Sequence, residues 1–244
     1  MLESNIPLVL KKIKPGDKVL DIGGWAGPLH RADYIMDMGD YESRRFHAAH
    51  AAGMPEHFTK ETWIQRDICD REPYPFKDKE LDFVLCSHTL EDIRDPLWVC
   101  SEMARISKAG YIEVPSRLAE TCRGVNRECP VGYHHHRWLV EIAGNEIFFR
   151  VKDPIISNHW SLSFPRKFWW SLSREQKVTF LFWEKNFKWS EVFLIDRDEI
   201  RAEMKAFVER YFEYPAWKFK AEATVKRVRQ MRRDAKDLIS GRKE

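Results

Sequence analysis

Hydrophobic and polar stretches alternate through the first half of the chain with the lengths of strands and helices. The clearest strand is the continuous apolar run at Leu81–Cys86, which is typical of a strand buried on both faces of a parallel sheet. A helix is predicted to begin at Asp95, with Pro96 in its first turn, and to stop near Gly110. The other predicted strands are Lys18–Ile22, Tyr34–Asp37, Trp63–Arg66 and Tyr111–Val114. This order favours an open, mostly parallel α/β sheet.

The second half of the chain has a weaker pattern. Residues 117–145 are rich in glycine, proline, cysteine and histidine, which predicts a lid. The last two strands of the sheet are predicted at Glu146–Val151 and Glu191–Ile195, on either side of an aromatic stretch. Residues 196–244 are predicted to be helical, and the first of these helices, Asp196–Phe212, begins with a capping box.

The aromatic stretch, residues 157–193, is open to three interpretations. Core filling is the default, because aromatic side chains bury large areas. The same side chains are also suited to stacking on a sugar or another flat substrate, or to a membrane interface. Because the stretch follows the predicted lid, we expect it to contribute to a partly apolar acceptor pocket.

Length and composition favour one domain. A chain of 244 residues is most simply a single domain with elaborations, so residues 1–244 are treated as one unit. No apolar run approaches the roughly 20 residues of a membrane span, and the apolar segment of a secretory signal is absent. The five cysteines are odd in number and scattered, which indicates reduced thiols. We therefore expect a cytoplasmic protein.

The positive charge is concentrated at the C-terminal end. Residues 216–244 contain 10 Lys/Arg and 4 Asp/Glu, a net charge of +6, whereas the rest of the chain carries −3. After Pro215 the apolar positions follow a helical period among basic residues, so this helix would pack one stripe and leave its charges in water. Contact with an anionic surface is the alternative, but no nucleic-acid module is recognisable and no such partner is expected.

Candidate binding residues lie where the predicted parallel strands end. Ligands in such sheets bind at the carboxyl ends of the strands. The first strand ends in Asp21-x-Gly23-x-Trp25-x-Gly27, a turn in which glycine lets the backbone approach a ligand. By itself this turn is a weak signal, and a tight strand exit is the less favoured alternative. Asp37 ends the second strand, where a carboxylate can accept hydrogen bonds from two ribose hydroxyls.

Two further segments extend this pattern. "RDICD" follows the third strand and places Asp67 where it can accept from an adenine amine. "LDFVLCSHTLED", Leu81–Asp92, supplies the fourth strand and the turn after it. Together with the glycine turn, these residues resemble the class I S-adenosylmethionine-dependent methyltransferases, in particular the small-molecule branch whose fourth strand reads "FDFV" followed by "SHxLEH". The resemblance covers roughly residues 15–116.

This resemblance implies a three-layer, Rossmann-like fold with a mostly parallel seven-stranded sheet, a lid insertion and C-terminal helices. It implies S-adenosyl-L-methionine as the methyl donor, bound by residues 1–116. The implied cofactor-binding residues are Asp21, Gly23, Gly24, Trp25 and Gly27 near the methionine part, Asp37 at the ribose, Asp67 and Ile68 at the adenine, and Ser87 with His88 beneath the methyl group.

The chain departs from the family pattern in two residues and one length. Trp25 replaces the middle glycine, and Asp92 replaces the histidine of the family sequence. Gly23 and Asp37 are also too close in sequence for a full helix between them, so only a turn is expected. The indole of Trp25 either turns outward over the pocket or blocks it. We expect an open pocket, because Asp37 and Asp67 are both retained.

Candidate catalytic residues are histidines. His88 follows the fourth strand and is either a general base, since imidazole titrates near neutral pH, or a residue that structures the turn. In "GYHHHRW" the histidines His134, His135 and His136 are further candidates for a base, and Tyr133 and Arg137 for substrate binding. The alternatives are a strand with alternating faces, or a metal held by Cys122, Cys129 and two histidines, whose spacing does not favour a zinc site. We expect no metal.

The sequence therefore predicts a methyltransferase that modifies an oxygen or nitrogen of a small molecule, such as a sugar or a sugar nucleotide. A homodimer is compatible with this prediction. Two alternatives stay open: a non-catalytic, methyltransferase-like binding protein whose pocket is filled by Trp25, and an RNA methyltransferase that uses the basic C-terminal helix.

Overall fold

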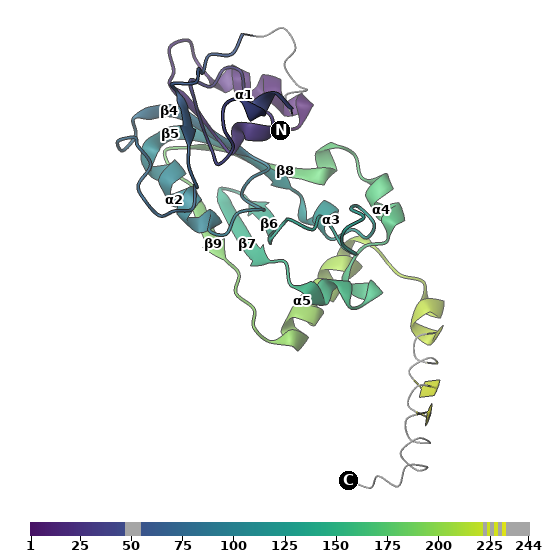
Figure 1. Ribbon diagram of the computed structural model, residues 1–244. Coiled ribbons are helices and arrows are strands. Elements are labelled where there is room, and N and C mark those ends of the chain that lie inside the picture. Colours follow the sequence, from purple (N-terminus) through teal and green to yellow (C-terminus); the bar gives the residue numbers. More distant parts are fainter. Residues whose placement is uncertain (47–54, 222–223, 225–226, 229–230, 233–244) are drawn as a thin grey trace.

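Two β-sheets form the body of the protein (Figure 1). The computed structural model describes residues 1–46, 55–221, 224, 227–228 and 231–232. The larger sheet has six strands in the order β3-β2-β1-β4-β5-β8. Its strands are β1 (Val19–Ile22), β2 (Tyr34–Asp37), β3 (Trp63–Gln65), β4 (Leu81–Ser87), β5 (Ser107–Pro115) and β8 (Val178–Glu184). The first five are mutually parallel, and β8 pairs antiparallel with β5.

The predicted open parallel sheet is confirmed, but its strand count differs. The central sheet has six strands instead of seven. Its last strand comes from the aromatic stretch at Val178–Glu184, which was not predicted as a strand. Apolar side chains there occupy both faces, with Leu181 and Trp183 buried and Phe182 against the other side. A strand that is apolar on both faces has no two-residue alternation for a sequence pattern to detect.

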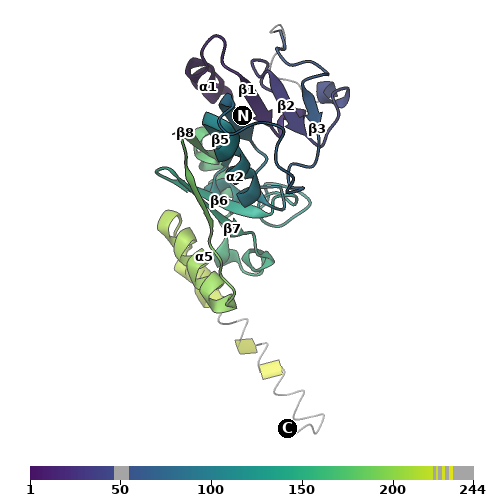
Figure 2. The same cartoon turned by 90° about the vertical axis from the view of Figure 1, so that its left-hand side faces the viewer.

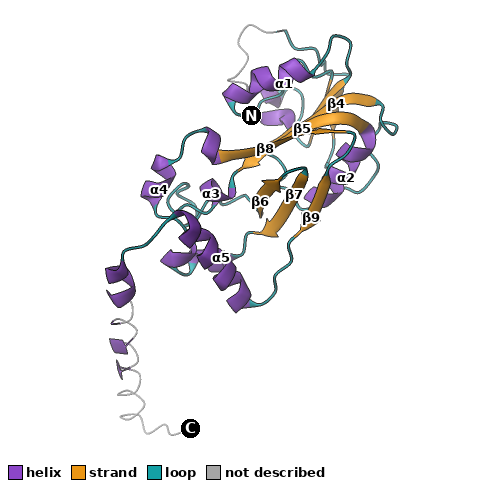
Figure 3. Ribbon diagram, turned by 180° about the vertical axis from the view of Figure 1, so that it is seen from behind, coloured by secondary structure: helices purple, strands orange, loops and turns teal. Residues whose placement is uncertain are grey.

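The second sheet contains β6 (Trp138–Ala143), β7 (Glu146–Val151) and β9 (Lys188–Glu191), in the order β6-β7-β9. Figure 3 shows these three strands beside the larger sheet. The prediction that Glu146–Val151 belongs to the central sheet is therefore wrong, although the strand itself exists. The predicted strand Glu191–Ile195 is also misplaced, because β9 ends at Glu191 and pairs with β7.

Alternate residues of the central strands pack into two different cores. On one face, α2 (Pro96–Ile106) and the second sheet cover the side chains of Ile22, Cys86 and Ile112. On the other face, α1 (Ile6–Lys12) and the loops around it cover Ile35 and related residues. Both faces of the sheet are thus buried, as the continuous apolar runs of its strands require.

Helix α2 begins as predicted and ends earlier than predicted. The Asp95 side chain accepts a hydrogen bond from Trp98 N at 3.1 Å, and Pro96 occupies the first turn. The helix ends at Ile106, and Gly110 lies inside β5. A Cβ atom at Gly110 would lie 2.5 Å from Val84 O and 2.6 Å from the Trp183 ring. The glycine therefore serves close packing in the sheet and does not end the helix.

The lid region and the C-terminal helix form the other end of the molecule (Figures 1 and 2). Here α3 (Arg117–Glu120), α4 (Arg166–Ser171) and α5 (Arg197–Tyr211) pack around Phe164. Asp196 caps α5 by accepting hydrogen bonds from the backbone of the first turn, as predicted. The buried Arg117 links α3 to β6 and α5, because it pairs with Glu141 and Glu203 at 2.7 and 2.6 Å.

The remaining elements are short. The 3-10 helices are Glu3–Asn5, Gly24–Ala26, Ser43–Phe46, Pro154–Ser157, Trp160–Leu162 and Glu175–Lys177. Residues 216–221 are helical and project from the body, and most of the predicted basic helix beyond them lies outside the described residues, as do His47–His50. Among the described helices, none combines the length and the apolar character that crossing a membrane requires.

Candidate cofactor and acceptor site

The turn after β1 depends on its first glycine. Gly23 has a φ of 78°, which favours glycine, and its N–H donates to Met36 O at 2.9 Å. A Cβ atom at this position would lie 2.0 Å from Thr89 Oγ1. The short 3-10 helix Gly24–Ala26 then takes the place of a full helix between β1 and β2, as the short spacing indicated.

Asp21 lies beneath this turn. Its side chain accepts a hydrogen bond from Leu29 N at 2.8 Å, and the residue is only 3% exposed. A Cβ atom at Gly24 would lie 2.8 Å from Asp21 Oδ2, so the turn passes directly over the carboxylate. Burial raises the pKa of Asp21 to about 7. The position suits a residue that shapes the turn.

Asp37 stands at the carboxyl end of β2, beside the turn. Its Oδ1 accepts from Gly39 N at 2.8 Å, and its Oδ2 accepts from Trp25 N at 3.1 Å. Burial raises the pKa of Asp37, and these backbone hydrogen bonds partly offset that rise. The two backbone contacts hold the carboxylate in a fixed orientation at the edge of the sheet.

The indole of Trp25 packs to one side of this carboxylate. Its Nε1 donates to Ser43 Oγ at 2.8 Å. Its ring covers Gly39 so closely that a Cβ atom there would lie 2.2 Å from the ring. Trp25 is therefore one wall of a cavity of about 470 Å³ and does not fill it.

Asp67 follows β3 and is engaged from two sides. Its Oδ1 accepts from Cys69 N at 2.9 Å, and its Oδ2 pairs with Arg94 Nη1 at 2.6 Å. The hydrogen bond from Cys69 and the positive charge of Arg94 lower the pKa of Asp67. Because Arg94 occupies one of its oxygens, an adenine amine would share this carboxylate or displace the arginine.

The cavity brings together side chains from the ends of four parallel strands. Its lining includes seven of the residues predicted from sequence: Gly23, Trp25, Asp37, Asp67, Ile68, His88 and, from the lid, Arg137. Of the other predicted cofactor residues, Asp21, Gly24, Gly27 and Ser87 are not part of the lining among the described residues. Ser87 lies near Glu113, with Oγ 3.5 Å from its carboxylate.

A second cavity adjoins the first and shares His88 and Asp92 with it. Its volume is also about 470 Å³. The lid contributes His135 and His136 to its wall, and Trp169 comes from α4. The remaining lining residues are Leu2, Glu91, Pro115, Ala119, Tyr133, Arg174, Lys177 and Val178. The shared wall places His88 and Asp92 between the two spaces.

His88 occupies this shared wall in a backbone conformation that is rare outside glycine, with φ 54°. Its Nε2 lies 3.1 Å from Glu113 Oε1, and its Nδ1 lies 3.5 Å from Glu91 Oε1. Burial alone would lower the pKa of His88, but the two carboxylates outweigh it and raise the pKa to about 9. The ring is therefore an imidazolium at neutral pH, which opposes the predicted role of general base.

Glu113 is the centre of this arrangement, and the sequence prediction missed it. The fully buried carboxylate accepts from Asn5 Nδ2 at 2.8 Å and from Leu2 N at 2.7 Å, in addition to His88. Burial raises its pKa, but the hydrogen bonds from His88, Tyr111 and Asn5 prevail and lower it to about 2. The available signal was a glutamate inside the apolar run "YIEVP", since a buried charge requires partners.

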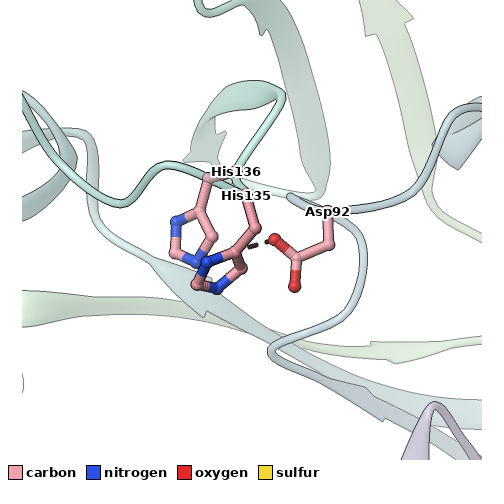
Figure 4. Close-up of side chains that lie close together, drawn as sticks. All are labelled: Asp92, His135 and His136. Atoms are coloured by element: carbon pink, nitrogen blue, oxygen red, sulfur yellow. Dashed lines mark ion pairs between the residues drawn. The ribbon is translucent and has the colours of Figure 1, made fainter. Parts of the chain in front are cut away.

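The three histidines of the lid separate into two groups, and Figure 4 shows His135 and His136 beside Asp92. His136 is held between carboxylates, with Nδ1 2.7 Å from Glu120 Oε2 and Nε2 3.6 Å from Asp92 Oδ1. His135 lies beside it, with ring centroids 4.5 Å apart. His134 is exposed, and its Nδ1 lies 3.5 Å from Asn126 Nδ2. The structure thus brings His135 and His136 to the second cavity and leaves His134 outside it.

The cysteines do not join this group. Cys122 Sγ contacts Leu118 O and Cys129 Sγ contacts Val131 O, each at 3.1 Å. A cluster of potential metal ligands in the described part of the chain consists instead of Asp92, His135 and His136. Asp92, which stands where the family sequence has histidine, has its pKa raised to about 6 by burial and by the neighbouring Glu91.

The strand order and the site at the carboxyl ends of the strands define the Rossmann-like fold of the class I S-adenosylmethionine-dependent methyltransferases, which confirms the resemblance at the level of the fold. Residues 4–123, slightly less than half of the chain, match the family model described as methionine biosynthesis protein MetW. No curated protein matches the chain.

Several solved structures are similar to the chain. A S-adenosylmethionine-dependent methyltransferase from Aquifex aeolicus has 21% identity and a TM-score of 0.33, covering 46% of this chain and 65% of its own. The YcgJ protein of Bacillus subtilis has 20% identity and a TM-score of 0.34, with coverages of 46% and 51%. A methyltransferase from Mesorhizobium loti has 13% identity and a TM-score of 0.37, with coverages of 61% and 64%. The chain thus spans about half to two thirds of these structures.

Proposed function

We propose that the protein is an S-adenosylmethionine-dependent methyltransferase that modifies a small molecule. The observation that carries this proposal is the pair of adjoining cavities, of about 470 Å³ each, that share His88 and Asp92. One lies on the strand ends that bind nucleotide-like ligands in such sheets, and the other lies under the lid. A methyl donor and a methyl acceptor need this arrangement of two sites in contact.

The residues of the first cavity fit the cofactor. Asp37 keeps unused lone pairs for the ribose hydroxyls, and Gly23 lines the cavity where the methionine part would pass. Ile68 offers an apolar surface to the adenine, and Asp67 an acceptor for its amine. When bound, S-adenosylmethionine supplies a methyl group on a positively charged sulfur, which an oxygen or nitrogen nucleophile can take up.

The second cavity suits an acceptor that is polar and carries a ring. Trp169 and Tyr133 supply aromatic faces, and Arg174 and Lys177 supply positive charge at the same wall. Lys177 Nζ lies 4.4 Å from the centre of the Trp169 ring, so the charge and the aromatic face are adjacent. A sugar nucleotide offers a ring for stacking and phosphates for the two cations.

The acceptor must lose a proton, and two residues of this wall are able to take it at neutral pH. Burial and the neighbouring histidines lower the pKa of His135, so its imidazole is neutral. Asp92, with a pKa near 6, is mostly ionised at pH 7. His88 is an imidazolium in this structure and would instead orient the acceptor as a hydrogen-bond donor.

Calorimetric titration with S-adenosylhomocysteine tests the cofactor site directly. We expect one molecule to bind per chain and to raise the melting temperature, because binding to the folded state alone stabilises it. Adenosine is the matched control and should bind more weakly, since it lacks the part that passes Gly23. The absence of both heat and thermal shift would sink the methyltransferase proposal and favour a non-catalytic, methyltransferase-like protein.

Methyl transfer from labelled S-adenosylmethionine to a panel of sugars, sugar nucleotides and RNA then identifies the acceptor class. The proposal predicts label in a small molecule and none in RNA. Transfer to RNA that is lost on truncation after Pro215 would support the alternative of an RNA methyltransferase and contradict the small-molecule acceptor.

A further inference from the structure

The shared wall of the two cavities contains a group of side chains with the composition of a metal site. One ligand atom each from Asp92, His135 and His136 lies within 4.8 Å of the other two. Figure 4 shows the two imidazoles and the carboxylate directed toward a common space. Two imidazoles and one carboxylate are a ligand set that holds Zn²⁺ and Fe²⁺ in enzymes and leaves further coordination positions open.

His136 is oriented for a metal by a second carboxylate. Its Nδ1 is fixed by Glu120 Oε2 at 2.7 Å, which leaves Nε2 facing Asp92. Glu120 is in turn held by Lys152 and by Tyr133 N at 3.0 Å. A carboxylate on the far nitrogen is the usual partner of a metal-binding histidine, because it sets the tautomer and the ring orientation.

One oxygen of the Asp92 carboxylate lacks a hydrogen-bond partner. Its Oδ1 is buried without a hydrogen bond, as is Oε2 of the adjacent Glu91, whose side chain is only 2% exposed. Glu91 faces the His88 imidazolium and Glu120 faces Lys152. Among the described residues, neither Asp92 nor Glu91 is paired with a lysine or an arginine. The Asp92 side chain is 35% exposed, but a buried carboxylate oxygen without a partner is costly, so a cation is the occupant that this space favours.

The spacing argues for an ion between the ligands and against a direct hydrogen bond. The 3.6 Å from His136 Nε2 to Asp92 Oδ1 is too long for a hydrogen bond. Ligand atoms at about 2.1 Å from an ion lie about 3.0–3.4 Å from each other, which is close to the observed separation. His135 is the third member of the cluster, and its ring is exposed.

We propose that Asp92, His135 and His136 bind a divalent first-row transition metal ion at the wall of the acceptor cavity. The role of this ion in methyl transfer rests on the proposed function. All three side chains line the second cavity, so an acceptor hydroxyl with a neighbouring oxygen could chelate the ion there. The ion would lower the pKa of that hydroxyl, so that it loses its proton to water near neutral pH and its oxygen is left as the nucleophile for the methyl group. The implied substrate class is a molecule with two adjacent oxygen donors, such as a vicinal diol of a sugar.

Titration of the chelator-treated protein with Co²⁺, followed by visible absorption and calorimetry, tests the site. We expect one Co²⁺ per chain, displaced by Zn²⁺. His135→Ala should weaken binding at least about 100-fold, because a direct ligand contributes at least as much as the outer partners of such ligands. His134→Ala is the matched control: it removes the neighbouring exposed histidine, which lies outside the cluster, and should leave Co²⁺ binding unchanged.

Three results would overturn the metal site: no Co²⁺ binding at about 1 mM, equal binding by His135→Ala and the native protein, or equal loss in both histidine variants. Asp92→Asn, checked for its melting temperature, gives the same test at a second ligand. S-adenosylhomocysteine titration of the metal-free protein separates the two proposals. Cofactor binding without Co²⁺ binding rejects the metal site alone, and Co²⁺ binding without cofactor binding rejects the methyltransferase alone.

Discussion

The carboxylate of Asp37 provides the sharpest test of the cofactor cavity. Each of its oxygens already accepts one backbone hydrogen bond, at 2.8 Å from Gly39 N and 3.1 Å from Trp25 N. A carboxylate oxygen has two lone pairs, so each oxygen keeps one for a ribose hydroxyl. Asp37→Asn preserves the size of the side chain, removes its charge and turns one of the two acceptors into a donor.

The expected loss follows from these contacts. A hydrogen bond to a charged group contributes about 1.5–3 kcal/mol, so losing one and weakening the other removes about 2–4 kcal/mol of binding free energy. At about 1.4 kcal/mol for each factor of ten, S-adenosylhomocysteine should bind about 30-fold to several hundred-fold more weakly. Isothermal titration calorimetry measures this change, and circular dichroism checks that the variant is folded.

Glu42→Gln is the control, because it removes a negative charge from an exposed residue whose partner is Lys60 at the surface. It should leave the affinity unchanged, since exposed charges are screened by solvent. If Asp37→Asn binds within about threefold of the native protein, the carboxylate does not hold the ribose and the cofactor has been placed wrongly.

Two further predictions concern the walls of the cavity. Gly23→Ala should lower the melting temperature more than Gly144→Ala. Both glycines have positive φ, a conformation that costs an alanine about 1–2 kcal/mol. Only at Gly23 would the new Cβ also meet Thr89, at 2.0 Å from its Oγ1. Equal losses would contradict the contact. Because the pKa of His88 is raised from 6.5 to about 9, its ion pairs stabilise the fold below about pH 6.5 and are lost as the pH rises toward 9. His88→Gln should therefore flatten the fall of the urea midpoint between these pH values, and an unchanged fall would refute the pairing.

The central sheet was predictable because its information is local. Each of the first five strands is a short apolar run bounded by polar or turn residues, and the structure shifts their ends by only a few positions. The common location of the candidate binding residues followed from the same pattern, because parallel strands present their carboxyl ends at one edge of the sheet. Asp37 and Asp67 therefore reach the same cavity although 30 positions separate them.

The sixth strand and the second sheet were not predictable in this way. β5 pairs with β8 across the whole lid, as in the pairing of Ile112 with Leu181, and no local pattern encodes such a choice. The strand Glu146–Val151 was detected, but its partner was not, since a hydrophobic pattern identifies a strand without naming its neighbours. The placement of β6 to β9 in the two sheets thus depends on tertiary strand pairing.

The sequence left the role of His88 open for a related reason. Its sequence position after β4 indicates an imidazole at the carboxyl end of the sheet, and the structure places it in the wall of the first cavity. Its charge, however, is set by Glu113, which lies on the neighbouring strand 25 positions away and carries no local signal of the contact. Protonation states depend on such long-range neighbours, so sequence alone supports the placement of a titratable group better than its role.

The lid shows how a long-range contact also positions the candidate metal ligands. Both Arg137 N and Trp138 N donate to Glu91 O, at 2.7 and 3.1 Å, and Trp138 Nε1 donates to Ile93 O at 2.9 Å. These bonds fasten the start of β6 to the turn after β4, so the residues before Arg137 are brought over Asp92. His135 and His136 therefore lie at the carboxyl end of the central sheet because the strand that follows them, β6, begins there. It follows that the two cavities share one structural support, and a ligand that shifts the turn after β4 on one side must also move His135 and His136 on the other.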